Sequence, residues 1–127
     1  MSGRLIRCSA AVGLAEHEVY RTLQFDRTGL STARDVMFAP GCYLEQHTGE
    51  HHALVMELPD ATTAVWAVWR DGCRPYLMVL PDCPEISHDA HEEGCGGYQG
   101  HPGGHAWELY LGRPDIPARP RRRRAAT

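Results

Sequence analysis

The segment spanning residues 81–104 constrains the fold of this chain more than any other, because its composition is incompatible with long helices or strands. It contains three prolines and six glycines. A structureless loop of more than about 15 residues is uncommon inside a compact domain unless it is functional, disordered or held by contacts other than backbone ladders. We therefore expect a long loop here, and we expect its remaining side chains to matter.

Six side chains of the kind that bind zinc lie within and just after this segment. Cysteine thiolate and neutral imidazole are typical zinc ligands, and a bound ion can supply much of the folding free energy of a small domain. The spacing lacks the paired Cys-x2-Cys of familiar zinc sites, so it is the density of ligands that favours metal binding. The candidate ligands are Cys83, His88, His91, Cys95, His101 and His105. One tetrahedral combination comprises Cys83, Cys95, His105 and either His88 or His91, with Cys73 as a substitute.

The length and composition indicate one globular domain. The chain has 127 residues, of which 43% are hydrophobic, as in an ordinary folded unit. All 13 basic residues are arginine, which indicates a GC-rich genome. We find no apolar run of the ~20 residues that a membrane helix needs and no secretory leader. The five cysteines, odd in number and irregularly spaced, then favour metal binding or free thiols in a reducing, cytoplasmic setting over disulfides.

Charge divides the chain into two parts. Residues 1–112 carry seven arginines against fifteen acidic residues, a net charge of −8, whereas residues 113–127 carry six arginines against one aspartate, a net of +5. We expect a globular domain over residues 1–112 and a flexible basic tail over residues 113–127. The acidic domain is a poor platform for nucleic acid. Any nucleic-acid contact, or nuclear import in a virus of a eukaryotic host, would depend on the tail residues Arg119, Arg121, Arg122, Arg123 and Arg124.

The hydrophobic pattern predicts short strands rather than long amphipathic helices. Residues with strand character recur in five segments, which are 19–25, 52–58, 63–69, 76–80 and 106–111. The clearest unit is a hairpin, in which Asp71-Gly72 supplies the tight turn between residues 63–69 and 76–80. The expected fold class is α+β, mainly β: a small antiparallel sheet or barrel with a long Gly/His/Cys-rich loop.

A second cluster of polar residues, His47, His51, His52 and Glu57, resembles in part the first motif of the cupin family. Part of that pattern is present in Gly41, His47, His52 and Glu57, and part of the second motif in Gly96 and Pro102-Gly103-Gly104-His105. The sequence departs from the family because it lacks the His-x-His of the first motif and its closing glycine. Cupins bind a divalent metal inside a small β-barrel, so the resemblance implies an alternative ligand set of His47, His52, Glu57 and His105.

Three functional hypotheses follow from these features. The leading one is a non-enzymatic accessory or regulatory protein, in which zinc orders residues 83–105 into a surface for a protein partner. The second is a cupin-like, metal-dependent enzyme with an open coordination position. The third is a protein-interaction module that binds no metal and leaves its histidines exposed. Residues 93–97 also resemble the flanks of the nucleophile in chymotrypsin-like cysteine proteases, which would make Cys95 a nucleophile.

Overall fold

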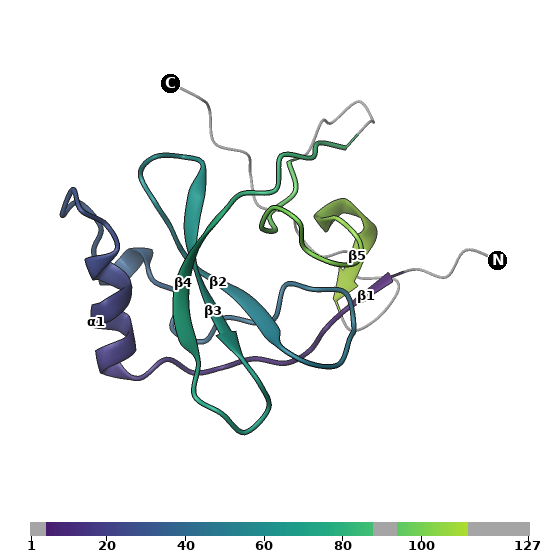
Figure 1. Cartoon of the computed structure of the whole chain (residues 1–127), viewed down its shortest axis with the longest axis horizontal. Helices are drawn as coiled ribbons and strands as arrows, with labels where there is room; N and C mark the ends of the chain where they lie inside the picture. The colour runs from purple at the N-terminus through teal and green to yellow at the C-terminus, as the bar shows by residue number, and fades with distance from the viewer. Residues whose placement is uncertain (1–4, 88–93, 112–127) are drawn as a thin grey trace.

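The computed structural model describes residues 5–87 and 94–111 (Figure 1). Its centre is a three-stranded antiparallel sheet with the strand order β2-β3-β4. The strands are β2 (His51–Glu57), β3 (Thr63–Trp69) and β4 (Tyr76–Pro81). The expected fold class, α+β and mainly β with a small antiparallel sheet, is confirmed. Among the described residues, no helix is long and apolar enough to cross a membrane.

Two further strands form a separate parallel pair, and short helices complete the described part of the chain. Strand β1 (Leu5–Arg7) pairs with β5 (Leu109–Leu111). The helical elements are α1 (Glu16–Gln24) and the 3-10 turns η1 (Ala33–Asp35) and η2 (Ala106–Glu108). In the view of Figure 1, α1 lies on one side of the sheet and the β1–β5 pair lies on the other.

The predicted hairpin is confirmed. Strands β3 and β4 pair in continuous antiparallel register, and the N–H of Cys73 donates to the carbonyl of Arg70 at 3.0 Å to close the turn. Gly72 has a φ of +80°, a conformation that residues with a Cβ rarely adopt. The strands expected at residues 52–58 and 76–80 are present with bounds shifted by one residue. The strand expected over residues 106–111 is shorter, because its first three residues form η2.

The strand predicted for residues 19–25 is wrong, because most of these residues belong to α1. Val19 and Leu23 share the parity of a strand face, but they are also four residues apart and so share one face of a helix. Both side chains pack against the core, whereas Tyr20 is exposed. A local hydrogen bond fixes the start of the helix, since the Glu18 carboxylate accepts the backbone N–H of Ala15 at 2.7 Å.

Strand β3 is buried on both faces and separates two hydrophobic clusters. Val65, Ala67 and Trp69 point into one cluster, against which α1 packs. Ala64 and Trp66 point into the other, because successive residues of a strand face opposite sides of the sheet. The described part of the Cys- and His-rich loop belongs to this second cluster. The sheet therefore supplies a rigid apolar support for that loop.

Candidate metal centres

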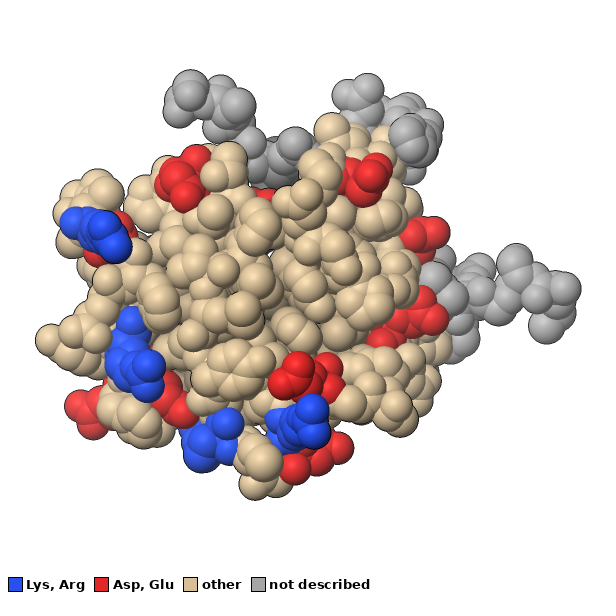
Figure 2. All heavy atoms as spheres, viewed as in Figure 1, with Lys and Arg blue, Asp and Glu red and all other residues tan. Residues whose placement is uncertain are grey.

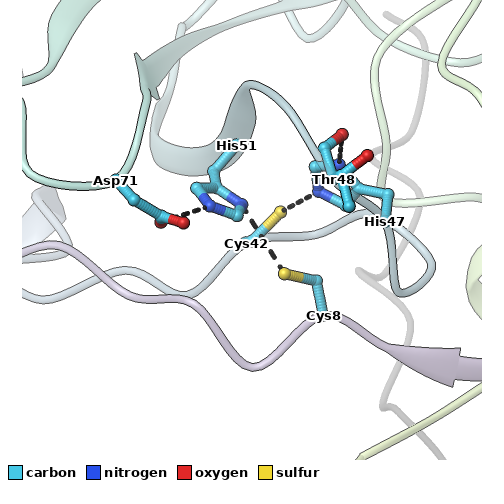
Figure 3. A network of polar contacts seen from close by, with 6 residues as sticks. All are labelled: Cys8, Cys42, His47, Thr48, His51 and Asp71. Carbon is cyan, nitrogen blue, oxygen red and sulfur yellow. Dashed lines mark hydrogen bonds and ion pairs between the residues drawn. The ribbon is translucent and has the colours of Figure 1, made fainter.

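Two groups of four side chains bring cysteine and histidine ligand atoms together in the described part of the chain. In each group the four ligand atoms lie within 4.8 Å of one another, and all five cysteines are free of disulfides. Either group could hold a metal ion. Site 1 comprises Cys8, Cys42, His47 and His51 (Figure 3). Site 2 comprises Cys83, Cys95, His101 and His105.

Site 1 is assembled from segments that are far apart in the sequence. Cys8 follows β1 directly and His51 begins β2, while the other two members lie in the loop before β2. The Cys8 sulfur is 3.6 Å from Nδ1 of His51, and the Cys42 sulfur is 3.3 Å from Nε2 of His47. Metal–ligand bonds of about 2.0–2.3 Å place neighbouring ligands of a tetrahedral zinc about 3.3–3.8 Å apart, which these separations match. The other ring nitrogen of His51 faces the Asp71 carboxylate at 2.8 Å (Figure 3).

Site 2 lies in the long loop after β4 and has the same dimensions. The Cys83 sulfur is 3.7 Å from Nδ1 of His105, and the Cys95 sulfur is 3.3 Å from Nε2 of His101. All four residues are among the six candidate ligands that the sequence indicates. The structure thus brings His101 into the group, a residue absent from the tetrahedral combination proposed from the sequence. The other two candidates, His88 and His91, lie outside the described residues.

Outer hydrogen bonds on one histidine of each site direct its inward nitrogen toward the cysteine. Nδ1 of His47 donates to the carbonyl of Thr48 at 2.9 Å, and Nδ1 of His101 donates to the carbonyl of Pro102 at 3.1 Å. A carbonyl only accepts, so Nδ1 carries the proton and Nε2 of the neutral ring carries the lone pair. Such outer partners commonly orient metal-binding histidines. Both rings are therefore prepared to bind an ion through Nε2.

Each site contains a buried thiol that resists ionisation in the absence of a cation. Burial raises the pKa of the Cys42 thiol to about 11, and the nearby Cys8 sulfur contributes to the increase. Burial likewise raises the pKa of Cys83 to about 11, and Cys95 contributes. Two neighbouring thiolates repel each other in a medium of low dielectric constant, and a bound divalent cation removes this penalty. Metal binding would therefore ionise thiols that burial otherwise keeps neutral.

Cys95 is the sulfur of site 2 that ionises more readily. Burial favours the neutral thiol, but hydrogen bonds to the sulfur from the His101 ring in its protonated form, from the Tyr43 hydroxyl and from the Gly97 N–H outweigh burial and lower the pKa of Cys95 to about 5. The same contact with Cys95 raises the pKa of His101. Because the thiolate is the metal-binding form of cysteine, Cys95 is already close to the form that a metal ion requires.

The residues of the alternative, cupin-like ligand set lie in different places. His47 belongs to site 1 and His105 to site 2. The ring of His52 lies against the ring of Tyr98, with centroids 4.7 Å apart, and burial lowers the pKa of His52. Glu57 is the last residue of β2, at the opposite end of that strand from site 1. The structure therefore does not bring these four side chains together around one position.

Two members of site 1, Cys8 and Cys42, are not among the residues singled out in the sequence, whereas His47 and His51 belong to the second candidate cluster. A signal exists, because the motif His-x-Gly-x-His occurs at residues 47–51 and again at residues 101–105, each time after a cysteine. Cys73, the substitute ligand suggested by the sequence, is exposed between β3 and β4 and belongs to neither site. The tail residues Arg119, Arg121, Arg122, Arg123 and Arg124 lie outside the described residues.

Comparisons with known proteins provide no family assignment. No protein-family model matches the chain, and neither curated proteins nor solved structures give a match. The chemistry of sites 1 and 2 is therefore the basis on which a function can be proposed.

Proposed function

We propose that sites 1 and 2 each bind one zinc ion and that both ions are structural. The observation that carries this proposal is the donor set, because each site offers two sulfur and two nitrogen atoms within 4.8 Å of one another. Two thiolates and two imidazoles are typical ligands of structural zinc, and four protein ligands leave no coordination position for water or substrate. A zinc ion also balances the charge of two thiolates in a buried setting.

The proposed ions would fasten irregular segments to both faces of β3. Cys42 is fully buried in the cluster on one face of this strand. Cys83 and Cys95, each 5% exposed, belong to the cluster on the other face. Strands this short bury little apolar surface on their own, and in such domains the free energy of metal binding becomes free energy of folding. Zinc would therefore stabilise the whole domain as well as the loop.

We further propose a non-enzymatic accessory or regulatory protein that binds a protein partner through the site 2 loop and the adjacent β4. Strand β4 is at one edge of the described sheet, and its Tyr76 and Val79 are 52% and 39% exposed. Figure 2 shows a face of the molecule with charged side chains around its rim and uncharged side chains across its middle. An uncharged centre within a polar rim is the usual composition of a protein–protein interface.

Native mass spectrometry of the full chain, purified without added metal, tests the zinc proposal. We expect two zinc ions per chain and a large decrease in melting temperature when a chelator is added. Replacing Cys83 and Cys95 together with serine should remove one ion and leave the other. Replacing Cys8 and Cys42 together should do the same for the other site. The control Cys73→Ser changes an exposed cysteine outside both sites and should retain both ions.

Other outcomes would support a different function. Retention of two ions after serine replaces Cys83 and Cys95 would overturn the proposal. Iron, manganese or nickel, held independently of the cysteines, would favour a metal-dependent enzyme over the zinc-bound accessory protein. A chain that binds no metal and whose melting temperature is unaffected by chelator would be the metal-free interaction module.

A further inference from the structure

Sites 1 and 2 are built from the same sequence pattern. Each contains a cysteine followed, after four or five residues, by His-x-Gly-x-His, which gives Cys42 with residues 47–51 and Cys95 with residues 101–105. The central glycine of each motif has a positive φ, +94° at Gly49 and +76° at Gly103, which glycine adopts without strain. In both motifs the first histidine faces a cysteine through Nε2, and the second faces the other cysteine through Nδ1.

The backbone of site 1 forms a reciprocal pair of hydrogen bonds around its two cysteines. The N–H of Cys8 donates to the carbonyl of Leu44, two residues after Cys42, at 2.8 Å. The N–H of Cys42 donates to the carbonyl of Ala10, two residues after Cys8, at 2.7 Å. The two cysteine-bearing segments are therefore held side by side by their backbones as well as by their sulfur atoms.

Site 2 repeats this arrangement at equivalent positions. The N–H of Cys83 donates to Gly97, and the N–H of Cys95 donates to Glu85, each at 3.0 Å and each two residues after the other cysteine. The flanking bridges also correspond, with Arg7–Glu45 matching Asp82–Tyr98 and Ala11–Gly41 matching Ile86–Gly94. The described chain thus contains two copies of one metal-binding unit. Unit 1 is residues 6–11 with 41–51, and unit 2 is residues 81–86 with 94–105.

Side chains of unit 1 contact unit 2 directly beside its ligands. The hydroxyl oxygen of Tyr43 accepts the backbone N–H of Gly96 at 3.1 Å and lies 3.4 Å from the Cys95 sulfur. Because this oxygen accepts from Gly96, its own O–H is available to donate to the sulfur. The Glu45 carboxylate accepts the backbone N–H of Gly104 at 3.0 Å, immediately before a histidine of site 2. The two units therefore share an interface made of the residues that flank their ligands.

We infer that units 1 and 2 bind their two metal ions cooperatively, with Tyr43 and Glu45 as the coupling residues. This inference rests on the proposed zinc binding. Metal at site 1 fixes residues 42–51 and so holds both coupling side chains where site 2 needs them. Metal at site 2 fixes the segments that contact Tyr43 and Glu45, namely Cys95–Gly96 and Gly104. It therefore favours metal binding at site 1, because coupling between two binding sites is reciprocal.

Native mass spectrometry during a zinc titration of the metal-free full chain measures this coupling. If the two sites were equal and independent, about half of the chains would carry one ion at half saturation. A coupling factor of about 25, within the usual range of roughly 5–150, reduces that fraction to about one sixth. We therefore expect metal-free and two-zinc chains to predominate, with the one-zinc form as a minor species throughout the titration.

Variants that keep all eight ligands identify the coupling residues. Combining Tyr43→Phe with Glu45→Ala should increase the one-zinc fraction about threefold, to about half, because coupling is removed while both sites remain. The matched control combines Tyr20→Phe with Glu16→Ala, which change exposed side chains of α1, and should titrate like the wild type. Glu45→Ala alone preserves the buried Tyr43 contacts and should give an intermediate distribution. This single variant keeps the test decisive if the double variant does not fold.

Each remaining outcome counts against one specific claim. A one-zinc form that reaches half or more of the wild-type chains would overturn the coupling and leave two-zinc binding intact. Unchanged distributions in both the double variant and Glu45→Ala would show that these side chains carry no coupling. Failure of the wild-type chain to bind zinc at all would instead overturn the proposed function.

Discussion

Nε2 of His51 lies 2.8 Å from a carboxylate oxygen of Asp71, while Nδ1 of the same ring faces the sulfur of Cys8 (Figure 3). His51 is buried, whereas Asp71 belongs to the exposed turn between β3 and β4. A carboxylate on the outer nitrogen fixes the tautomer of a histidine and increases its basicity toward a metal ion. The hairpin turn therefore acts on site 1 without contributing a ligand.

We predict that Asp71→Ala weakens zinc binding at site 1 about tenfold, the lower end of the usual 10–100-fold effect of outer-shell partners, because the carboxylate is exposed to water. Competition with a chromophoric chelator measures the affinity. Asp60→Ala is the matched control, since Asp60 accepts hydrogen bonds from Thr62 and Thr63 in a turn that contains no metal ligand. Equal affinities for Asp71→Ala and the wild type, or an equal loss in the control, would contradict the prediction.

Trp66 should be one of the largest single contributors to the stability of the domain. Its side chain is fully buried and packs edge-on against Tyr43 and Tyr98, with ring centroids 6.0 and 5.2 Å apart. We predict that Trp66→Ala lowers the free energy of unfolding by about 3–5 kcal/mol, because the core loses apolar contacts and gains a cavity. Phe38→Ala, which removes an aromatic ring that is 54% exposed, should change it by about 0.5 kcal/mol or less. Urea denaturation of both variants in excess zinc measures the difference, and similar losses would refute it.

The hairpin was accessible to prediction from the sequence because its determinants are local. Its two strands are short apolar runs rich in β-branched and aromatic residues, and Asp71-Gly72 marks the turn between them. Helix α1 was not accessible in the same way, because Val19 and Leu23 fit one face of a strand and one face of a helix equally well. Their true partners are core residues distant in the sequence. Tertiary packing, rather than local pattern, decides between the two.

The same contrast separates the two metal sites. The four residues of site 2 fall within 23 positions of one another, so their density alone draws attention to the loop. In site 1, Cys8 precedes Cys42 by 34 positions, and α1 lies between them. The pairing of these two segments depends on backbone hydrogen bonds that no local pattern encodes. The repeated His-x-Gly-x-His motif is the sequence signal that the two sites share. The equivalent backbone hydrogen bonds around their cysteines show that it marks two copies of one unit.

The turn after α1 should make stability depend on acidity. The Asp26 carboxylate accepts hydrogen bonds from the hydroxyl and N–H groups of Ser31 and Thr28, which lower its pKa well below the ordinary value. An aspartate in the unfolded chain has a pKa of about 3.9. The ionised Asp26 carboxylate therefore stabilises the fold above that pH, and its contribution decreases as the pH falls toward the lowered pKa of the folded state. We predict that Asp26→Asn lowers the melting temperature at pH 7 and that the difference from the wild type narrows between about pH 5 and pH 3.

Thermal melts of both proteins in excess zinc, at matched ionic strength, test this prediction. Acid also protonates the proposed metal ligands, but it does so in both proteins, so their difference isolates Asp26. Glu16→Gln, at an exposed carboxylate in the first turn of α1, is the control and should follow the wild type at every pH. A difference that stays constant down to pH 3 would show that the carboxylate does not act through its ionised form.

The reactivity of the five cysteines should report directly on metal binding. Cys73 is exposed, whereas Cys42, Cys83 and Cys95 are buried and Cys8 is half-buried. A thiolate that is bound to metal and shielded from solvent is a poor nucleophile toward an alkylating reagent. We predict that N-ethylmaleimide modifies the zinc-loaded chain rapidly at one position only, and that chelation exposes the other four. Intact-mass spectrometry over time counts the modified thiols.

The control Cys73→Ser should abolish the rapid modification while leaving the four slow thiols and both zinc ions unchanged. Rapid alkylation of all five cysteines in the presence of zinc would show that sites 1 and 2 do not protect their sulfur atoms. Slow alkylation that is equally slow after chelation would attribute the protection to burial alone, since the fold would then shield the thiols without a metal ion. A chelator-dependent increase from one to five modified thiols would show that the metal ions protect the other four thiols, because protection by the fold alone would persist after chelation.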